Sequence, residues 1–233
     1  TKVAPVPPTL NYDFWLGPSP LRRFNPNRFH FNFRWFWSHA GGLMTDWAVH
    51  LLNIALWGMG DDPPRTVSSS GGIHVLRDNR ETPDTQTTVF DFPSYTLIWE
   101  HQVGCALGPD RRSWGIWFGG TEGAVIVDGD GWEIIPEPKK KLLQPEKRPG
   151  NTDSRLAHVK NFLDCVRSRR QPAQHLELGH FVSTVAHLGN IAYRAGRRIA
   201  WDAATEKVVN DPEADRLVGV EYRKPWALPY YPR

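Results

Sequence analysis

Apolar residues recur every three or four positions in three stretches of the chain, a spacing typical of amphipathic helices. The stretches are residues 45–57, 154–168 and 178–195. Gly58 and Gly60 follow the first stretch and predict its end, because glycine is favoured directly after a helix. The last predicted helix has a second face, which carries His180, Thr184, His187 and Ile191.

Between the first two helices the pattern changes to short β-strands rich in Val, Ile, Thr and aromatic residues. The predicted strands are residues 66–75, 85–92, 95–102, 113–118, 124–127 and 132–135. Most links between them are short, and short links join antiparallel neighbours, because a parallel crossover needs about a dozen residues. The order of elements predicts an α+β fold: an open, mostly antiparallel sheet, largely a meander, with helices packed on one face. The other face meets solvent or, given its apolar content, another subunit.

We predict one domain over residues 1–233, because a chain of this length can bury a substantial core. Its proline-rich start predicts a connector over residues 1–10, and residues 9–40 are dense in turn residues. A polar stretch rich in Pro, Lys and Glu predicts a mobile loop over residues 137–150. Residues 200–233 predict an extended C-terminal arm, in which Asp202 caps a short turn and prolines then prevent regular structure; these prolines are Pro225, Pro229 and Pro232.

The balance of 28 basic and 25 acidic residues gives a net charge of +3, and the basic residues are scattered. This charge is too small to indicate a nucleic-acid partner. No signal-peptide pattern begins at Thr1, and no apolar run is long enough to span a membrane, so we expect a soluble chain without assigning a compartment. Cys105 and Cys165 have neither metal-binding spacing nor a local partner, so we expect no disulfide between them.

The most informative motif follows the glycine pair Gly41-Gly42. Asp46, His50 and Asn53 stand at positions i, i+4 and i+7 of the first predicted helix and therefore share one face. A carboxylate one turn from an imidazole can orient the ring and stabilise its protonated form, as a general acid or base requires. The pattern makes His50 a candidate catalytic base, with Asp46 as its orienting partner.

The segment just upstream alternates large aromatics with side chains that form hydrogen bonds, from Arg28 to Trp37. Two interpretations stay open. The alternation suits an amphipathic strand with one buried face. It also suits a pocket wall in which aromatic rings lie beneath a sugar ring and polar groups bind its hydroxyls. In that case the substrate-binding candidates are Arg28, His30, Arg34 and Trp35, together with Asn53 and His187 from the helices.

Several motifs are absent. The chain has no Gly-x-Gly-x-x-Gly between a strand and a helix, no Gly-x-x-x-x-Gly-Lys-Ser/Thr and no Gly-x-Ser-x-Gly. The sequence therefore predicts no phosphate cradle for a nucleotide. A metal site from His30, His50 and His187 has no supporting ligand spacing, so we predict no metal.

Gly41-Gly42 followed by Asp46 and His50 resembles the substrate-domain signature of the Gfo/Idh/MocA oxidoreductases. Further stretches resemble the bacterial branch of this family and occur in the family's order: DFWLGP (13–18), FNPNR (24–28), ETPDTQ (81–86), GTEG (120–123) and HLGNIAY (187–193). The resemblance implies a C-terminal substrate domain with an open antiparallel sheet. It also implies hydride transfer between a sugar or polyol and NAD or NADP, with His50 as base and Asp46 as its partner.

The resemblance further implies a homo-oligomer through the sheet face. The chain corresponds to the substrate domain alone, so the family's Rossmann domain, with its nucleotide site and its Glu-Lys-Pro lysine, is not among these residues. Glu146-Lys147-Arg148-Pro149 has one residue too many to replace that motif. A Rossmann domain in cis or in trans would then be a partner.

Three function classes follow. The first is the substrate-binding and catalytic-base half of an NAD(P)-dependent sugar oxidoreductase, not competent alone. The second is a stand-alone sugar-binding or assembly module without redox activity. The third is redox-neutral acid/base chemistry on a sugar by Asp46 and His50, which would need a second acid that the sequence does not identify.

Overall fold

The structure is a computed structural model that describes residues 3–60, 62–140, 142–150 and 153–227. Its contacts divide the chain into two compact units. Unit 1 contains the described residues of Thr1–Val49, Asp62–Gly104 and Ser183–Arg233, and unit 2 contains those of His50–Asp61 and Cys105–Val182. Each unit has its own sheet. The single domain over residues 1–233 stays a prediction.

The predicted helices are present. The first is divided at Trp47 into α2 (Leu43–Asp46) and α3 (Ala48–Met59), although Trp47 itself keeps right-handed helical dihedral angles. The other two are α4 (Ser154–Ser168) and α5 (Leu176–Ala195). Shorter helical elements are α1 (Tyr12–Leu16), α6 (Pro212–Asp215) and the 3-10 helices η1 (Pro26–Arg28), η2 (His30–Trp35) and η3 (Pro109–Arg111).

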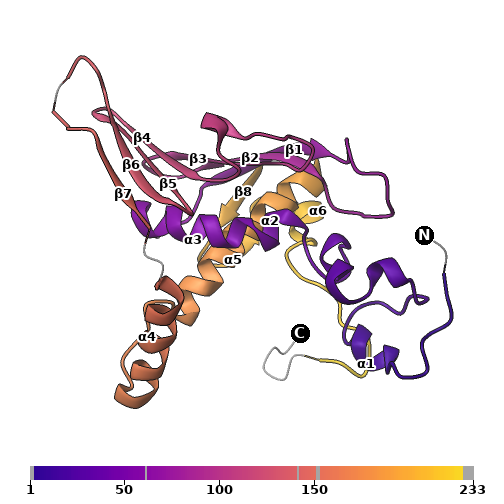
Figure 1. The fold of residues 1–233 in the computed structure, drawn as a ribbon. Coiled ribbons are helices and arrows are strands. Elements are labelled where there is room, and N and C mark those ends of the chain that lie inside the picture. Colours follow the sequence, from indigo (N-terminus) through magenta and orange to yellow (C-terminus); the bar gives the residue numbers. More distant parts are fainter. Residues whose placement is uncertain (1–2, 61, 141, 151–152, 228–233) are drawn as a thin grey trace. The chain divides into compact units, whose positions relative to one another are not determined.

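Unit 1 contains a five-stranded antiparallel sheet of order β3-β2-β1-β8-β9 (Figure 1). Its strands are β1 (Thr66–Gly72), β2 (Thr85–Asp91), β3 (Thr96–Gln102), β8 (Ile199–Asp202) and β9 (Lys207–Val208). The meander of β1 to β3 confirms the predicted antiparallel sheet. Strands β8 and β9 correct the prediction of an extended arm, because the buried Ile199 pairs with Val67 of β1. Of the predicted arm, residues 228–233, with Pro229 and Pro232, lie outside the described residues.

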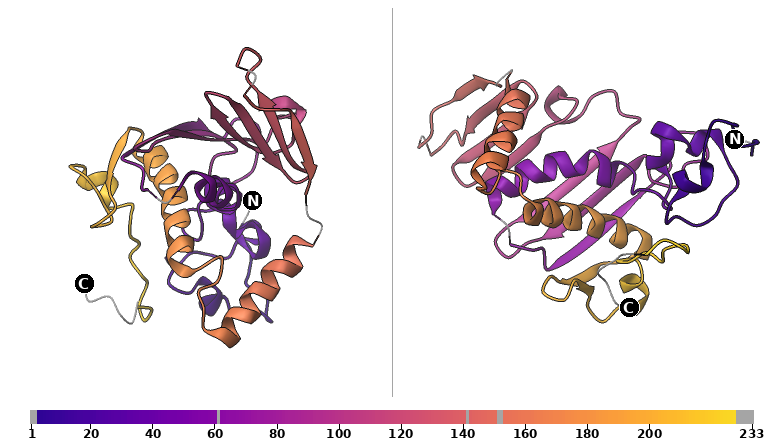
Figure 2. Two further views of the ribbon diagram at one scale, coloured as in Figure 1. Left: turned by 90° about the vertical axis from the view of Figure 1, so that its left-hand side faces the viewer. Right: turned by 90° about the horizontal axis from the view of Figure 1, so that it is seen from below.

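The inner face of this sheet packs against α5, which lies across the strands when they are seen from below (Figure 2, right). Gln86 Nε2 donates to the Gly189 carbonyl at 3.4 Å, and a Cβ on Gly189 would lie 2.9 Å from Met44 Sδ. The outward side chains of β1 to β3 are mostly polar. Six of them carry hydroxyls, three are charged or amide side chains and two are apolar: Thr66, Ser68, Ser70, Thr85, Thr87 and Thr96; Asp91, Glu100 and Gln102; Val89 and Ile98. The apolar outer face expected from the sequence is therefore not found on this sheet.

Unit 2 contains a second antiparallel sheet, of order β4-β5-β6-β7, where the sequence predicted one sheet in all. Its strands are β4 (Ile116–Gly120), β5 (Gly123–Asp128), β6 (Gly131–Pro136) and β7 (Glu146–Pro149). β7 lies in the stretch predicted as a loop, so that prediction is wrong for these four residues. The backbone of β7 pairs with β6 although its charged side chains carry no strand pattern. Within this unit, Gly58 of α3 lies close to the ring of Phe118.

Within the described residues, no helix combines the length and apolar character needed to cross a membrane. Neither Cys105 nor Cys165 forms a disulfide in the described part of the chain. Among the same residues, no group of three or more His, Cys, Asp or Glu side chains is placed to hold a metal ion.

Asp84, at the start of β2, is fully buried and holds the loop before it in place. Its carboxylate accepts hydrogen bonds from the backbone amides of His74, Val75 and Leu76 at 2.7–2.9 Å and from the Thr85 hydroxyl at 3.0 Å. Burial alone would raise the pKa of Asp84, but the hydrogen bonds to its charged form outweigh burial and hold the pKa well below its usual range.

We expect Asp84→Asn to lower the free energy of unfolding at pH 7 by about 3 kcal/mol, because an amide NH₂ would face buried N–H donors. Because the folded-state pKa is depressed, the stabilisation is present above the ordinary carboxyl pKa of about 4 and is lost as pH falls further. The gap between wild type and variant should therefore narrow in acid. Urea denaturation at several pH values measures this, and the exposed Asp164→Asn on α4 is the control. An unchanged urea midpoint for Asp84→Asn would contradict this role.

Candidate functional site

The glycine pair fixes the start of α2 by letting other parts of unit 1 come close. Gly42 has φ 63° and ψ −155°, and a Cβ there would lie 2.6 Å from Thr82 Cβ. A Cβ on Gly41 would lie 2.4 Å from Asn190 Nδ2, whose amide donates to the Gly41 carbonyl at 2.8 Å. The Gly42 amide also donates to the Arg34 carbonyl at 2.9 Å. Both glycines are therefore required by packing, and this packing positions the helix that carries Asp46.

Asp46 closes α2 and pairs with Arg34, another predicted site residue. Arg34 Nε lies 3.3 Å from Asp46 Oδ2, and the two side chains are 20% and 33% exposed. The Arg34 guanidinium also lies over the Phe31 ring, 3.9 Å from its centroid, and 5.8 Å from the centroid of Trp35. The structure therefore brings Arg34, Trp35 and Asp46 together, and Arg34 balances the charge of Asp46.

His50 and Asn53 belong to unit 2, on the first two turns of α3. His50 is exposed, as a base that must reach a substrate has to be. Asn53 Nδ2 donates to Gln174 Oε1 at 2.9 Å, while its own Oδ1 is buried without a hydrogen-bond partner. The structure thus gives Asn53 a contact that ties α3 to the chain before α5.

The segment before the glycine pair forms the 3-10 helices η1 and η2, so its interpretation as an amphipathic strand is wrong. Asn25 caps η1 by accepting from the Asn27 amide at 2.9 Å, and Pro26 supplies the fixed φ that favours a helical start. His30 then has φ 50°, a left-handed conformation that interrupts regular pairing. His30 is exposed, and its ring lies 3.8 Å from that of Phe29.

Aromatic rings of η2 and of the residues after it form cation–π contacts with three arginines of unit 1, two of which are distant in the sequence. Arg28 lies 4.8 Å from the Phe36 ring, Arg80 lies 5.2 Å from Trp35, and Arg194 of α5 lies 5.2 Å from Trp37. The partners Arg80 and Arg194 were not predicted from the sequence. They are 45 and 157 positions from the rings they cover, so no local pattern could have indicated them.

Glu81 is a third residue that the sequence did not single out for the site. Its carboxylate pairs with Arg22 at 3.1 Å and accepts the Trp37 amide at 2.9 Å, and its own amide donates to the Trp35 carbonyl at 2.9 Å. Glu81 therefore anchors the aromatic segment to the loop before β2. The resemblance had marked residues 81–86, but without a role for Glu81.

His187 lies on α5, with its side chain reaching the surface. Enough protein surrounds the ring that burial lowers the pKa of His187, which favours the neutral imidazole. A neutral imidazole can both donate and accept a hydrogen bond, as a sugar hydroxyl requires. No contact in the structure joins His187 to Arg34 or Asp46, so its substrate-binding role stays a prediction.

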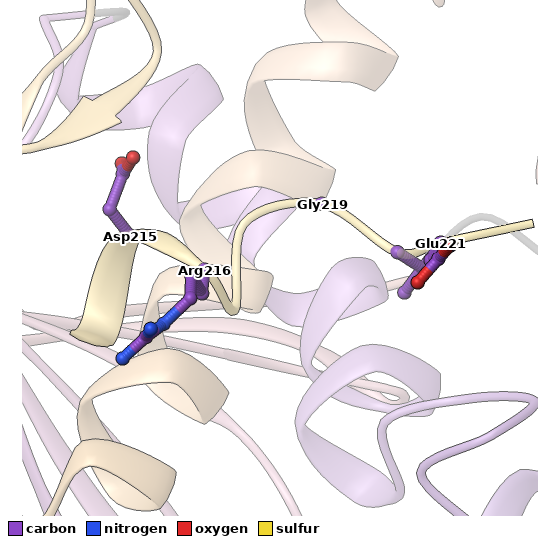
Figure 3. A pocket seen from close by; sticks show the side chains of 5 residues that line it. Asp215, Arg216, Gly219 and Glu221 are labelled. Atoms are coloured by element: carbon purple, nitrogen blue, oxygen red, sulfur yellow. The ribbon is translucent and has the colours of Figure 1, made fainter. Parts of the chain in front are cut away.

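A pocket of about 440 Å³ lies elsewhere in unit 1, beside α6 (Figure 3). It is lined by Asp215, Arg216, Gly219, Val220 and Glu221, and it contains none of the predicted site residues. The side chains of Asp215 and Arg216 point in different directions (Figure 3). Nothing links this pocket to the motif of Asp46 and His50.

A nicotinamide dinucleotide needs a helix start whose backbone amides are free to receive its phosphates. The start of α2, where the glycine pair stands, does not fit this need. The Gly42 amide is bonded to Arg34, and Thr82 and Asn190 occupy the space that the two glycines leave. The residues at this helix start are therefore unsuited to NAD or NADP, and we derive no step through a cofactor held there.

A comparison with protein-family models matches residues 1–228 to the oxidoreductase family, C-terminal alpha/beta domain, of the Gfo/Idh/MocA type. A comparison with curated proteins found no significant match. Solved structures show the fold. An NAD-binding protein from Listeria innocua has 22% identity and a TM-score of 0.53, and the alignment covers 70% of this chain and 52% of that one.

Two further similar structures come from enzymes. The WlbA dehydrogenase from Bordetella pertussis, in complex with NADH and UDP-GlcNAcA, has 20% identity and a TM-score of 0.53, covering 72% of this chain and 49% of that chain. The aldose-aldose oxidoreductase from Caulobacter crescentus, complexed with glycerol, has 20% identity and a TM-score of 0.56, covering 70% and 49%. The aligned part is about half the length of these proteins. Since the family match spans nearly the whole chain, this chain belongs to the Gfo/Idh/MocA oxidoreductase family and corresponds to its C-terminal α/β domain.

Proposed function

We propose that this chain is the substrate-binding and catalytic-base part of an NAD(P)-dependent oxidoreductase that acts on a sugar or polyol by hydride transfer. The observation that carries the proposal is the motif after the glycine pair. Gly41 and Gly42 fix the start of α2, Asp46 closes that helix, and His50 stands exposed four residues later on α3.

The residues suit the proton transfer of such a reaction. When a secondary alcohol becomes a ketone, the carbon loses a hydride and the oxygen loses a proton. In this proposal His50 takes the proton from the hydroxyl group. Asp46, held in place by its ion pair with Arg34, would orient the imidazole and stabilise its charged form.

Aromatic and polar groups next to Asp46 suit a sugar ligand. Trp35 offers an apolar ring surface for the C–H face of a sugar, and Arg28, His30 and Arg34 carry hydrogen-bond donors for its hydroxyls. Asn53 and His187 are the further substrate-binding candidates. Two similar proteins support this class of substrate, since one was solved in complex with UDP-GlcNAcA and another is an aldose-aldose oxidoreductase.

The hydride acceptor would be NAD or NADP, and a similar protein, the WlbA dehydrogenase, was solved in complex with NADH, the reduced form. It would be held by protein outside this chain, in a nucleotide-binding domain in cis or in trans, and it would supply the oxidising chemistry. We further propose that copies of this chain associate through a sheet face. The hydroxyl-rich outer face of the five-stranded sheet would make such a contact polar.

A second candidate is a sugar-binding or assembly module without redox activity. The packing at the start of α2 favours this second candidate, because Thr82 and Asn190 occupy the space that a nucleotide would need there.

The experiment that separates the two candidates supplies NAD or NADP and a panel of sugars and polyols to the chain together with its nucleotide-binding domain. Formation of reduced nicotinamide is followed by absorbance. Sugar-dependent reduction supports the oxidoreductase. Sugar binding without any reduction, across the panel and with both nucleotides, would support the module instead.

A further inference from the structure

Residues 22–35 of unit 1 contain four arginines, and Arg80 lies over the Trp35 ring of the same segment; three of these five arginines have a carboxylate partner. Arg22 pairs with Glu81 at 3.1 Å, Arg34 with Asp46 at 3.3 Å and Arg80 with Asp78 at 2.8 Å. These pairs leave little net charge at their own positions. The same segment also contains guanidinium groups that have no carboxylate partner among the described residues.

Arg28, at the end of η1, is such a group. Among the described residues, no carboxylate lies within ion-pair distance of its guanidinium, which rests on the Phe36 ring at 4.8 Å. Its Nε is buried and has no hydrogen-bond acceptor. A buried donor without an acceptor costs free energy, and a buried charge without a counter-charge costs more. The side chain as a whole stays partly exposed, so a ligand can reach it.

His39 adds a second buried nitrogen without a hydrogen-bond partner. It is linked to Arg28 through Phe36, whose ring lies beneath Arg28 and whose carbonyl accepts the His39 amide at 2.9 Å. Its Nδ1 shares a hydrogen bond of 2.8 Å with the Ser38 hydroxyl, its ring lies 5.0 Å from that of Trp15, and its Nε2 is buried without a partner. Burial lowers the pKa of His39, and the charges of Arg28 and Arg22 lower it further, against an opposing effect of Glu81. The guanidiniums of Arg28 and Arg22 would attract a negative charge placed near His39.

We propose that Arg28 and His39 form a subsite for an oxyanion, and that the sugar ligand of this chain carries a carboxylate or phosphate group. The proposal rests on the proposed function in taking the ligand to be a sugar. Arg28 would donate charge-assisted hydrogen bonds to the oxyanion, and His39 Nε2 would add a donor when Nδ1 accepts from Ser38. Trp15 forms an apolar wall next to the imidazole.

Titration of the His39 Cε1–H signal by NMR tests the subsite without any redox assay. The probes are inorganic phosphate, D-glucuronate, D-glucose 6-phosphate and neutral D-glucose, each added at constant ionic strength. We expect phosphate and at least one anionic sugar to raise the pKa of His39, because an anion opposes the field of Arg28. Glucose should leave it unchanged. The two sugars identify the source: glucuronate for a carboxylate, glucose 6-phosphate for a phosphate.

Arg28→Gln should weaken binding of the anionic probes about 10- to 100-fold, and Arg28→Lys should restore part of it. Arg155→Gln, exposed on α4, is the matched control and should bind like wild type. Equal affinity for glucuronate, glucose 6-phosphate and glucose, unaltered by Arg28→Gln, would overturn the oxyanion subsite and leave sugar binding intact. Binding of phosphate that Arg28→Gln abolishes, with no sugar bound, would support the subsite and contradict the sugar function.

Discussion

We expect His50→Ala to lower kcat for sugar oxidation by about two to four orders of magnitude, the usual contribution of a general base. The substitution removes an exposed side chain from the first turns of α3 and leaves no buried cavity, so stability should change little. The assay is steady-state reduction of NAD or NADP by the chain together with its nucleotide-binding domain.

The control for this prediction is His158→Ala, which removes an equally exposed histidine from α4. It should keep wild-type kcat. If His50 acts as the base, added imidazole should recover part of the activity of His50→Ala, because it can take the substrate proton from solution. A His50→Ala variant with wild-type kcat would show that the proton leaves by another route, and His50 would lose its assigned role.

Gly42→Ala should lower the free energy of unfolding by about 4 kcal/mol, since two separate costs combine. Its φ of 63° with ψ of −155° is a conformation that costs an L-residue about 1–3 kcal/mol. The added methyl group would also lie 2.6 Å from Thr82 Cβ, and overpacking of this kind costs about 1–3 kcal/mol. Urea denaturation measures the sum.

Gly219→Ala is the matched control for the glycine. A Cβ at Gly219 meets nothing within 4 Å, and its φ is not in the positive range. We expect its free energy of unfolding to stay within about 0.5 kcal/mol of wild type. If Gly42→Ala unfolded at the wild-type urea midpoint, the glycine pair would not be required by packing, and a direct role toward a ligand would become the better explanation.

Local patterns of apolar residues predicted the bounds of two elements closely. α4 begins and ends at the predicted residues, and β2 differs from its prediction by one residue. In both cases the apolar or β-branched pattern continues to the end of the element. α4 shows the limit of such patterns: its apolar stripe forms a helix, but Leu156 and Val159 remain exposed. Periodicity predicts the helix and leaves open what covers it.

Elements that depend on distant partners were not predictable from local pattern. β7 is a run of charged residues that becomes a strand only because β6 offers a free edge. β8 joins β1 across more than a hundred residues, so no link length could indicate the pairing. The sequence left a strand open as one interpretation of η2, because alternating aromatics suit a strand as well, and the left-handed turn at His30 is not apparent from the residue type.

The candidate site likewise has features that could be predicted from the sequence and features that could not. The spacing of Asp46 and His50, at positions i and i+4, could be taken directly from the sequence. The ion pair of Asp46 with Arg34 does not follow, because it depends on how η2 folds back toward the glycine pair. The roles of Glu81, Arg80 and Arg194 depend on the same long-range contacts.

The central claim is that this chain holds the substrate and the base but not the nucleotide, and calorimetric titration of the chain alone tests it most directly. Sugars and polyols, including the anionic ones, are titrated in one series, and NAD and NADP in another. If the chain holds the substrate and the base but not the nucleotide, we expect heat of binding for a sugar and none for either nucleotide. Tight binding of NAD or NADP by this chain would contradict it.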